Sequence, residues 1–412
     1  MRRPEMGEPG KPTLEREVSL PMLVLYGLGT TIGAGIYALT GEVAGAAGMK
    51  APLAFAVSAL LAGITAVGFA ELAGRLPKAA GEAVFVDRAF GRAGVTRIVG
   101  LAVVVAGVVA ASAISRAFGG YVAELIDWPR WLLVVGLVVA LGAIAIIGVK
   151  QSVSAAAVLT VVEVIGLGLV VWAGRDSLSG LVSEAGELLG PPTSAAGWSG
   201  VMGGAFLAFF AFLGFEDMDA VAEETKNAPV NLPRAILITL VVTTVLYMTV
   251  AAVAVLEVDP ALLAESDAPL ALIYEEAGGR AGVLAFIAAL AMVNGALVQL
   301  VMLPRVVYGL SNLGLVPAWP GAVSARTNTP VRATVGAVVV VAVLAISVEL
   351  EWLARVTSAT TMAIFITVNV ALVAIKAKDG PTTTFQVPGW VPVVGTVAAS
   401  GMFITEVARL IF

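Results

Sequence analysis

The chain has 412 residues, of which 59% are hydrophobic and only 13% are charged, and it contains no Cys and no His. Soluble domains carry about 25% charged residues, so this composition excludes an ordinary soluble protein and indicates a polytopic membrane protein. Without Cys or His, disulfides, thiolate metal sites and the usual general base are excluded, and without a basic block a nucleic-acid partner is not expected. No cofactor and no metal site are expected.

The first apolar segment, 20–45, follows a polar tail at 1–19 and carries an unusual concentration of glycine. Gly27, Gly29, Gly33 and Gly35 lie within nine positions. Each Gly costs roughly 1 kcal/mol relative to Ala in a helix interior, which favours an interrupted helix. In lipid, an interrupted helix is tolerated only where its free backbone groups are buried in protein or line a cavity. The alternative is that these glycines only allow close helix packing.

An interrupted helix would present two kinds of backbone group at the same place. The free N–H groups at the start of the second half favour an anion, and the last carbonyls of the first half favour a cation. A zwitterion with adjacent ammonium and carboxylate groups fits both ends. The segment therefore predicts a site for such a molecule.

Ten further apolar segments are each long enough to cross a hydrocarbon core of about 30 Å, which gives about eleven spans in total. They lie at 51–74, 95–125, 131–148, 153–173, 199–222, 234–256, 281–310, 331–348, 353–375 and 390–411. Short helices that do not cross the membrane are expected at Phe85–Gly94, Leu178–Leu189 and Pro269–Glu276.

The sixth segment, 199–222, is also expected to be interrupted. Gly214 ends an apolar run, and Glu216, Asp217 and Asp219 follow it. Charges near the middle of a membrane cost several kcal/mol unless they face a cavity or a partner. The residues after this segment, 226–233, contain two prolines and are expected to form an inner loop.

The spacing of the two interrupted segments predicts an inverted repeat. Five spans separate their starts, so the first span begins on the inner side of the membrane and the sixth begins on the outer side. The chain thus divides into two five-helix halves, 20–173 and 199–375, with an additional helix at 390–411. Corresponding interrupted segments in two halves point to a transporter site at the bilayer midplane.

The distribution of positive charge gives the orientation. Most of the 24 Lys and Arg residues fall on one side of the predicted spans, together with the N-terminus. The positive-inside rule then places the N-terminus in the cytoplasm, and an odd number of spans places the C-terminus outside the cell membrane.

Several short motifs occur in a fixed order along the chain. They read GTTIGAGIY at 29–37, PKAAGE at 77–82, FFAFLGFE at 209–216, EETKN at 223–227, LPRAI at 232–236 and RVVYGL at 305–310. Together they resemble the signatures of the amino acid–polyamine–organocation superfamily of transporters. The resemblance covers spans one to ten and implies the inverted five-plus-five fold. Most relatives have twelve spans. Because eleven are expected here, it is the twelfth helix of the family that is in question.

The resemblance also implies a concrete substrate site between the first and sixth helices. The backbone N–H groups of Ala34 and Gly35, with Gly33 and Ile36 beside them, would hold a carboxylate. The carbonyls of Thr31 and Leu213 would hold an ammonium group. Phe210 would be an aromatic gate. Phe215 and Ile32 would line the pocket for the substrate side chain, and ordinary helix packing is the alternative for these two.

Two acidic residues are candidates for coupling transport to an ion. Glu163 lies in the middle of the fifth span, with no basic residue within ten positions on either side. Desolvation disfavours the charged form of such a carboxylate, so Glu163 can take up a proton during a transport cycle. It can instead help to bind sodium with carbonyls of residues 29–32, or make a structural hydrogen bond. Glu216 is the second candidate.

The sequence thus favours a secondary active transporter of amino acids that is coupled to protons. A sodium-coupled or exchange transporter of amino acids or amines is the alternative, and a non-transporting amino acid sensor is a third possibility. The candidate pocket residues are apolar, which favours a neutral substrate. An enzyme is not expected, and the chain is expected to be a monomer or a weak oligomer in the lipid bilayer.

Overall fold

The computed structural model describes residues 16–77, 81–147, 153–381 and 385–411. Its α-helices are α1 Leu20–Ile32, α2 Gly35–Ala47, α3 Ala51–Arg75, α4 Gly81–Phe90, α5 Ala93–Ala123, α6 Arg130–Ile147, α7 Val153–Ala173, α8 Leu181–Leu189, α9 Ala195–Phe212, α10 Ala228–Glu257, α11 Pro260–Glu265, α12 Pro269–Glu276, α13 Ala281–Asn312, α14 Val331–Ser347, α15 Leu350–Asp379 and α16 Trp390–Ile411. Three 3-10 helices complete the list: η1 Gly48–Lys50, η2 Ser177–Gly180 and η3 Glu216–Glu224.

The membrane class expected from composition is confirmed. Within the described residues, nine helical stretches are long and apolar enough to cross a membrane, and α1 and α14 are shorter apolar helices. One of the nine runs from α2 through η1 to the end of α3, so that it joins parts of two predicted spans. The chain is therefore a multi-pass helical membrane protein.

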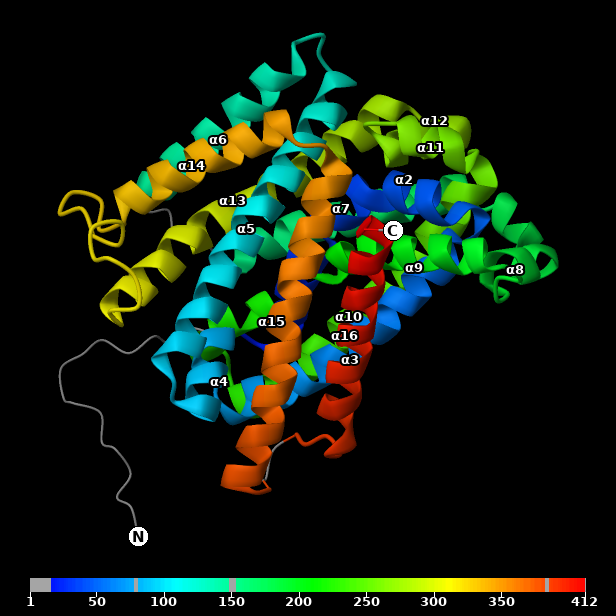
Figure 1. The fold of residues 1–412 in the computed structure, drawn as a ribbon. Coiled ribbons are helices and arrows are strands. Elements are labelled where there is room, and N and C mark those ends of the chain that lie inside the picture. Colours follow the sequence, from blue (N-terminus) through cyan, green and yellow to red (C-terminus); the bar gives the residue numbers. More distant parts are fainter. Residues whose placement is uncertain (1–15, 78–80, 148–152, 382–384, 412) are drawn as a thin grey trace.

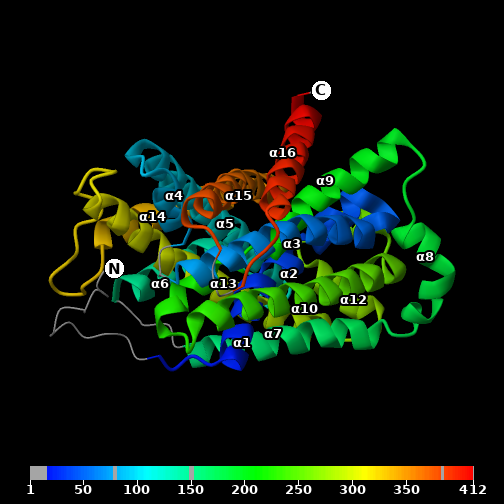
Figure 2. The same ribbon diagram turned by 90° about the horizontal axis from the view of Figure 1, so that it is seen from below.

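Helices that are distant in sequence lie side by side in the bundle (Figures 1 and 2). α3 packs against α10, α2 packs against α9, and α5 contacts both α13 and α15. α14 lies along α6, and α16 runs beside α15 at the periphery. The buried faces of these helices are rich in Ala and Gly, because small side chains let helix backbones approach closely where lipid gives no hydrophobic drive.

The short helices are placed as follows. The helix predicted at Pro269–Glu276 is confirmed as α12. The helix predicted at Phe85–Gly94 occurs earlier, as α4, and it ends before Gly91, whose φ of 59° leaves the right-handed helical region. The segment Leu178–Leu189 contains η2 followed by α8.

The prediction of an inner loop at 226–233 is wrong for most of this segment, because α10 already begins at Ala228. Pro229 lies in the first turn, where a missing N–H group costs nothing. Pro233 continues the helix, and both prolines lie against Gly74 of α3, where an added Cβ would be 3.1 Å from the Pro229 carbonyl oxygen and from Pro233 Cγ. The helix that packs against α3 thus starts earlier than residue 234, where the sequence pattern had placed its beginning.

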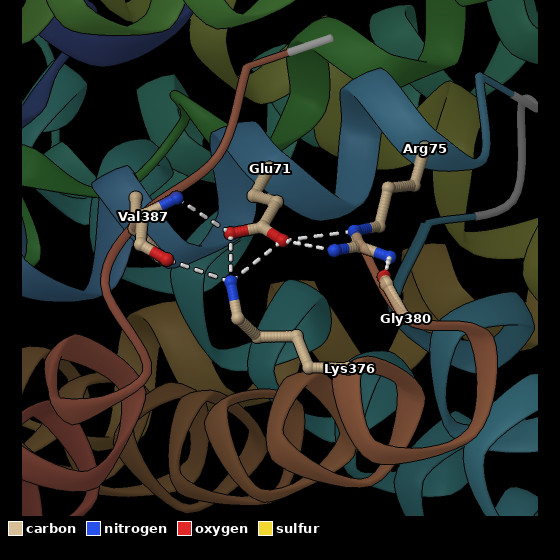
Figure 3. Close-up of polar contacts among 5 residues, drawn as sticks. All are labelled: Glu71, Arg75, Lys376, Gly380 and Val387. Atoms are coloured by element: carbon tan, nitrogen blue, oxygen red, sulfur yellow. Dashed lines mark hydrogen bonds and ion pairs between the residues drawn. The ribbon is translucent and has the colours of Figure 1, made fainter. Parts of the chain in front are cut away.

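A buried ionic cluster joins α3, α15 and the segment that leads to α16 (Figure 3). The side chain of Glu71 is fully buried and accepts hydrogen bonds from Lys376 Nζ at 2.7 Å, from Arg75 Nε at 2.8 Å and from the backbone N–H of Val387 at 2.8 Å. Lys376 also donates to the Val387 carbonyl, and Arg75 donates to the Gly380 carbonyl. Both carboxylate oxygens of Glu71 are therefore satisfied, and one side chain holds three parts of the chain together.

Removing the carboxylate from this cluster is expected to destabilise the protein strongly. Glu71→Ala leaves Lys376 and Arg75 without their partner, and breaking a buried ion pair in this way costs about 3–5 kcal/mol. Asp379→Asn is the matched control, because its pair with Arg88 is exposed and such pairs are worth about 1 kcal/mol or less. The midpoint of thermal unfolding of the purified protein should fall far more for Glu71→Ala; equal shifts would contradict this assignment.

Candidate functional site

The first apolar segment is interrupted between α1 and α2. α1 ends at Ile32, Gly33 has a φ of 27°, and α2 starts at Gly35. The Gly33 N–H group donates to the Gly29 carbonyl at 3.2 Å, and the next such bond runs from Ala38 to the Ala34 carbonyl. Within the described chain, no acceptor is found for the N–H groups of residues 34–37. These four groups are available to an acceptor that the described residues do not supply.

The sixth segment changes its conformation at Leu213 and Gly214. α9 ends at Phe212, Leu213 is extended, and Gly214 has a φ of 115° before η3 begins at Glu216. The Glu216 carboxylate accepts a hydrogen bond from the Gly214 N–H group at 2.8 Å. Glu216 thus satisfies a backbone group of this interruption, which is a structural use in addition to the coupling role predicted for it.

A threonine joins the two interrupted segments. Thr30 Oγ1 lies 2.8 Å from the Gly214 carbonyl oxygen and 3.1 Å from that of Gly27 within its own helix. The backbones are so close here that a Cβ on Gly214 would overlap the Thr30 carbonyl. Only glycine fits at position 214, because both the positive φ and the close approach exclude a side chain.

A tyrosine from α10 makes the second connection. The hydroxyl of Tyr247 lies 2.9 Å from the Thr31 carbonyl oxygen and 2.9 Å from the Ala211 carbonyl oxygen. On the same side, a Cβ on Gly35 would come within 2.6 Å of Ala211 Cα, so glycine is needed there for α2 and α9 to approach. Thr31, predicted to present its carbonyl to an ammonium group, therefore already shares that carbonyl with Tyr247.

The chain before α1 is tied to the chain after η3. The Val18 N–H group donates to the Glu224 carbonyl at 3.0 Å, and the Lys226 N–H group donates to the Val18 carbonyl at 2.9 Å. These two bonds form an isolated parallel bridge between Val18 and Thr225. The two interrupted segments are thus held together at their interruptions and also at one end.

Glu163 lies beside the first interruption. The Tyr37 hydroxyl donates to the Glu163 backbone carbonyl at 2.6 Å, and Asn294 Nδ2 of α13 donates to Glu163 Oε1 at 3.3 Å. The side chain is 1% exposed, and its Oε2 has no hydrogen-bond partner among the described residues. The next residue of α13, Gly295, faces the interruption directly, since a Cβ there would lie 3.8 Å from the Ala34 nitrogen.

The predicted apolar site residues are buried around this region. Ile32 and Ile36 are fully buried, Phe210 in the last turn of α9 is 7% exposed, and Leu213 is half-buried. Phe215 is fully buried, and its ring packs against Phe69 and Phe365 at centroid distances of 5.9 and 5.4 Å. Of these predicted apolar residues, all except Leu213 are buried by the protein.

The acidic run after Gly214 meets a second element that sequence reasoning did not connect with it. Asp219 is 7% exposed, and its Oδ2 has no partner in the part of the chain that is described. A Cβ on Gly81 of α4 would overlap Asp219, so α4 approaches η3 closely there. The neighbouring Glu82 is near enough for its charge to act on Asp217 and Asp219.

Sequence reasoning missed Thr30, Tyr247 and Asn294 as parts of the site. Each is a polar residue within an apolar segment, and such residues in membrane spans commonly face a partner or a cavity. That signal was present, but single polar residues are too frequent in the chain for the pattern to select these three without the fold.

The Tyr247 contact predicts a measurable loss of stability. Tyr247→Phe removes the hydroxyl from two buried carbonyls, and leaving a buried acceptor unsatisfied costs about 1–3 kcal/mol. The matched control is Tyr274→Phe, because the half-buried Tyr274 makes no hydrogen bond through its hydroxyl within the described structure. The thermal midpoint should fall for Tyr247→Phe and stay unchanged for the control; a midpoint equal to wild type in both would show that the bridge is not stabilising.

Comparisons with known proteins identify the family. The family model described as "Amino acid permease" matches residues 19–410. Branched-chain amino acid permease BcaP of Bacillus subtilis (strain 168) is 30% identical over 94% of this chain and 87% of its own length. Vacuolar cationic amino acid transporter 4 of Arabidopsis thaliana is 30% identical over 89% of this chain, and cationic amino acid transporter 4 of Homo sapiens is 27% identical over 90%. These matches cover only 64% and 62% of the two longer relatives.

The chain therefore belongs to the amino acid permeases of the amino acid–polyamine–organocation superfamily, and it is a membrane transporter and not an enzyme.

Proposed function

We propose that this permease is a secondary active transporter that carries an amino acid across the cell membrane by alternating access, driven by protons. One observation carries the proposal: the N–H groups of residues 34–37 lack acceptors within the described chain although they are buried. An unpaired buried donor costs free energy, so such a group is usually satisfied by a partner. A substrate carboxylate is a partner of the right charge for a helix N-terminus.

The ammonium group of the same substrate would lie against carbonyls at the ends of α1 and α9. The Leu213 carbonyl receives no hydrogen bond from any described residue, whereas the Thr31 carbonyl can accept a second bond beside that of Tyr247. The ammonium and the carboxylate would then face the two sides of the gap, which suits an α-amino acid because both of its charged groups are attached to one carbon. Phe210 would close the gap as a gate.

The packing of the helices supports two inverted five-helix halves, 20–173 and 199–375. Counted from each interruption, α3 corresponds to α10, α5 to α13 and α6 to α14, and each of these pairs is in contact. A two-fold relation between the halves would produce such contacts, and rocking of one half against the other gives alternating access. The positive charges then orient the N-terminus towards the cytoplasm and the C-terminus outwards.

The substrate we favour is a neutral amino acid with an apolar side chain. The buried side chains next to the gap include Ile32, Phe210 and Phe215, and none of them offers a charge. This choice agrees with the printed name of the Bacillus subtilis relative, a branched-chain amino acid permease. A cationic amino acid is the second candidate, because Asp219 is buried with one unpaired oxygen and the plant and human relatives are named for cationic substrates.

Glu163 is the proposed proton carrier. Its Oε2 is buried without a partner in the described residues, so a proton can bind there without first breaking a hydrogen bond. Tyr37 and Asn294 connect Glu163 to α2 and α13, the elements that flank the gap. A proton shifts the balance between two transporter states only if it binds one state more tightly, and movement of α1 past α7 would provide that difference. Sodium bound at the same place is the alternative.

The carboxylate assignment is tested by ligand binding to the purified protein. Leucine should raise the midpoint of thermal unfolding, and arginine should have little effect. The decarboxylated amine of leucine should bind at least about tenfold more weakly, because hydrogen bonds to a charged group are worth about 1.5–3 kcal/mol each. Gly35→Val should abolish binding through contact with Ala211, whereas Gly136→Val in α6, where a Cβ meets open space, should not. Equal binding of the acid and the amine would refute the site, and a larger shift with arginine would select the cationic alternative.

Proton coupling is tested by uptake into liposomes at different external pH values. Uptake should rise as the external pH falls and should not need sodium. Glu163→Gln should keep substrate binding but flatten the pH response, and Glu187→Gln on the exposed face of α8 should behave as wild type. A requirement for sodium would support the ion-site alternative, and full pH dependence in Glu163→Gln would move the carrier to Glu216. Binding without counterflow of labelled substrate would indicate a sensor.

A further inference from the structure

A groove of about 580 Å³ lies between the first half of α9 and the last half of α16. Its walls include Trp198, Met202 and Gly203 of α9 and Met402, Thr405 and Arg409 of α16. The two helices diverge towards these ends, as Figure 2 shows for the N-terminal end of α9 and the C-terminal end of α16. The groove is therefore open at the end of the bundle where α16 finishes.

The groove opens towards lipid and not into the transport pathway. α16 is a peripheral helix, and its apolar side chains Ile404 and Val407 beside the groove are 64% and 40% exposed. In a membrane protein, exposed apolar side chains on an outer helix face acyl chains. Trp198 is 43% exposed at the start of α9, and aromatic rings of this kind are enriched at the level of the lipid headgroups.

One cation in the groove has no hydrogen-bond or ion-pair partner among the described residues. Arg355 makes ion pairs with both Glu351 and Glu406, so these carboxylates are already engaged. The guanidinium of Arg409 makes no ion pair or hydrogen bond with any described residue, and it lies against Gly203, where an added Cβ would overlap it. Because residue 203 is glycine, there is room for the Arg409 guanidinium, whose N–H groups have no acceptor among the described residues.

We propose that this groove binds a phospholipid of the surrounding bilayer, with the lipid phosphate held by Arg409 and the acyl chains lying along Met202 and Met402. A guanidinium offers planar, paired N–H donors that match a phosphate. The position of Arg409 in the last turns of a span places it at headgroup depth, where long cationic side chains reach out of the hydrocarbon. The apolar walls of the groove continue from that point into the span.

The test measures lipid retention by the purified full-length protein with native mass spectrometry. Phosphatidylglycerol is the probe, and diacylglycerol, which has the same chains and no phosphate, is the comparison lipid. Arg409→Gln should weaken phosphatidylglycerol binding about tenfold and leave diacylglycerol binding unchanged, because only the phosphate contact is lost. Arg280→Gln is the matched control, since Arg280 is exposed before α13 and is not part of the groove.

A second variant tests the groove itself without a change of charge. Thr405 is exposed and lines the groove, so Thr405→Trp should fill it and displace both lipids. The proposal is overturned if Arg409→Gln retains phosphatidylglycerol as wild type does, or if Arg280→Gln loses as much. It is also overturned if the spectra show dimers that Thr405→Trp separates, because the groove would then be covered by a second copy of the chain.

Discussion

The structure depends on how it treats the free backbone groups of two interrupted segments inside a membrane. A helix end in lipid leaves N–H and C=O groups that no water can satisfy, and each costs several kcal/mol if it stays unpaired. The protein places the two interruptions against each other, so that the carbonyls of Thr31 and Ala211 share one hydroxyl and the Gly214 carbonyl receives another. The carbonyl side of the site is in this way mostly satisfied by the protein.

The N–H side of the two interruptions is treated differently. At the second interruption the N–H groups of Leu213 and Asp217 have backbone acceptors and that of Gly214 is bonded to Glu216, whereas those of residues 34–37 receive no acceptor from the described chain. The surrounding side chains are apolar and buried, so water does not replace the missing acceptor freely. The chain belongs to the amino acid permeases, and we propose the carboxylate of an amino acid substrate as the acceptor for these groups.

The two polar clusters of the molecule have opposite characters. Glu71 is buried with all its hydrogen-bonding capacity used by Lys376, Arg75 and a backbone group, so it acts as a fixed joint between α3 and α15. Glu163 is about as buried, but its Oε2 has no hydrogen-bond partner in the part of the chain that the structure describes. A saturated network rigidifies its surroundings, whereas an unsaturated one can change its protonation or its partners. The second type is the one suited to a transport cycle.

Much about this protein could be predicted from its sequence alone. The low content of charged residues determined the membrane class, because a charge in hydrocarbon is too costly to be frequent. The motifs at 29–37 and 209–216 indicated the family and located the two interrupted segments to which we assign the substrate site. Local chemistry was sufficient for α12, since Pro269 begins a short helix and a glycine follows it at 278.

Other features were decided only by the tertiary structure, because they depend on residues that are far apart in the chain. The start of α10 at Ala228 depends on Gly74, which receives the prolines that looked like loop residues. The roles of Tyr247 and Asn294 arise from the packing of α10 and α13 on the first interruption. The sequence by itself determined that backbone groups would be left free in the membrane, and the tertiary structure decided which of them the protein would satisfy, since that choice depends on which distant side chains reach them.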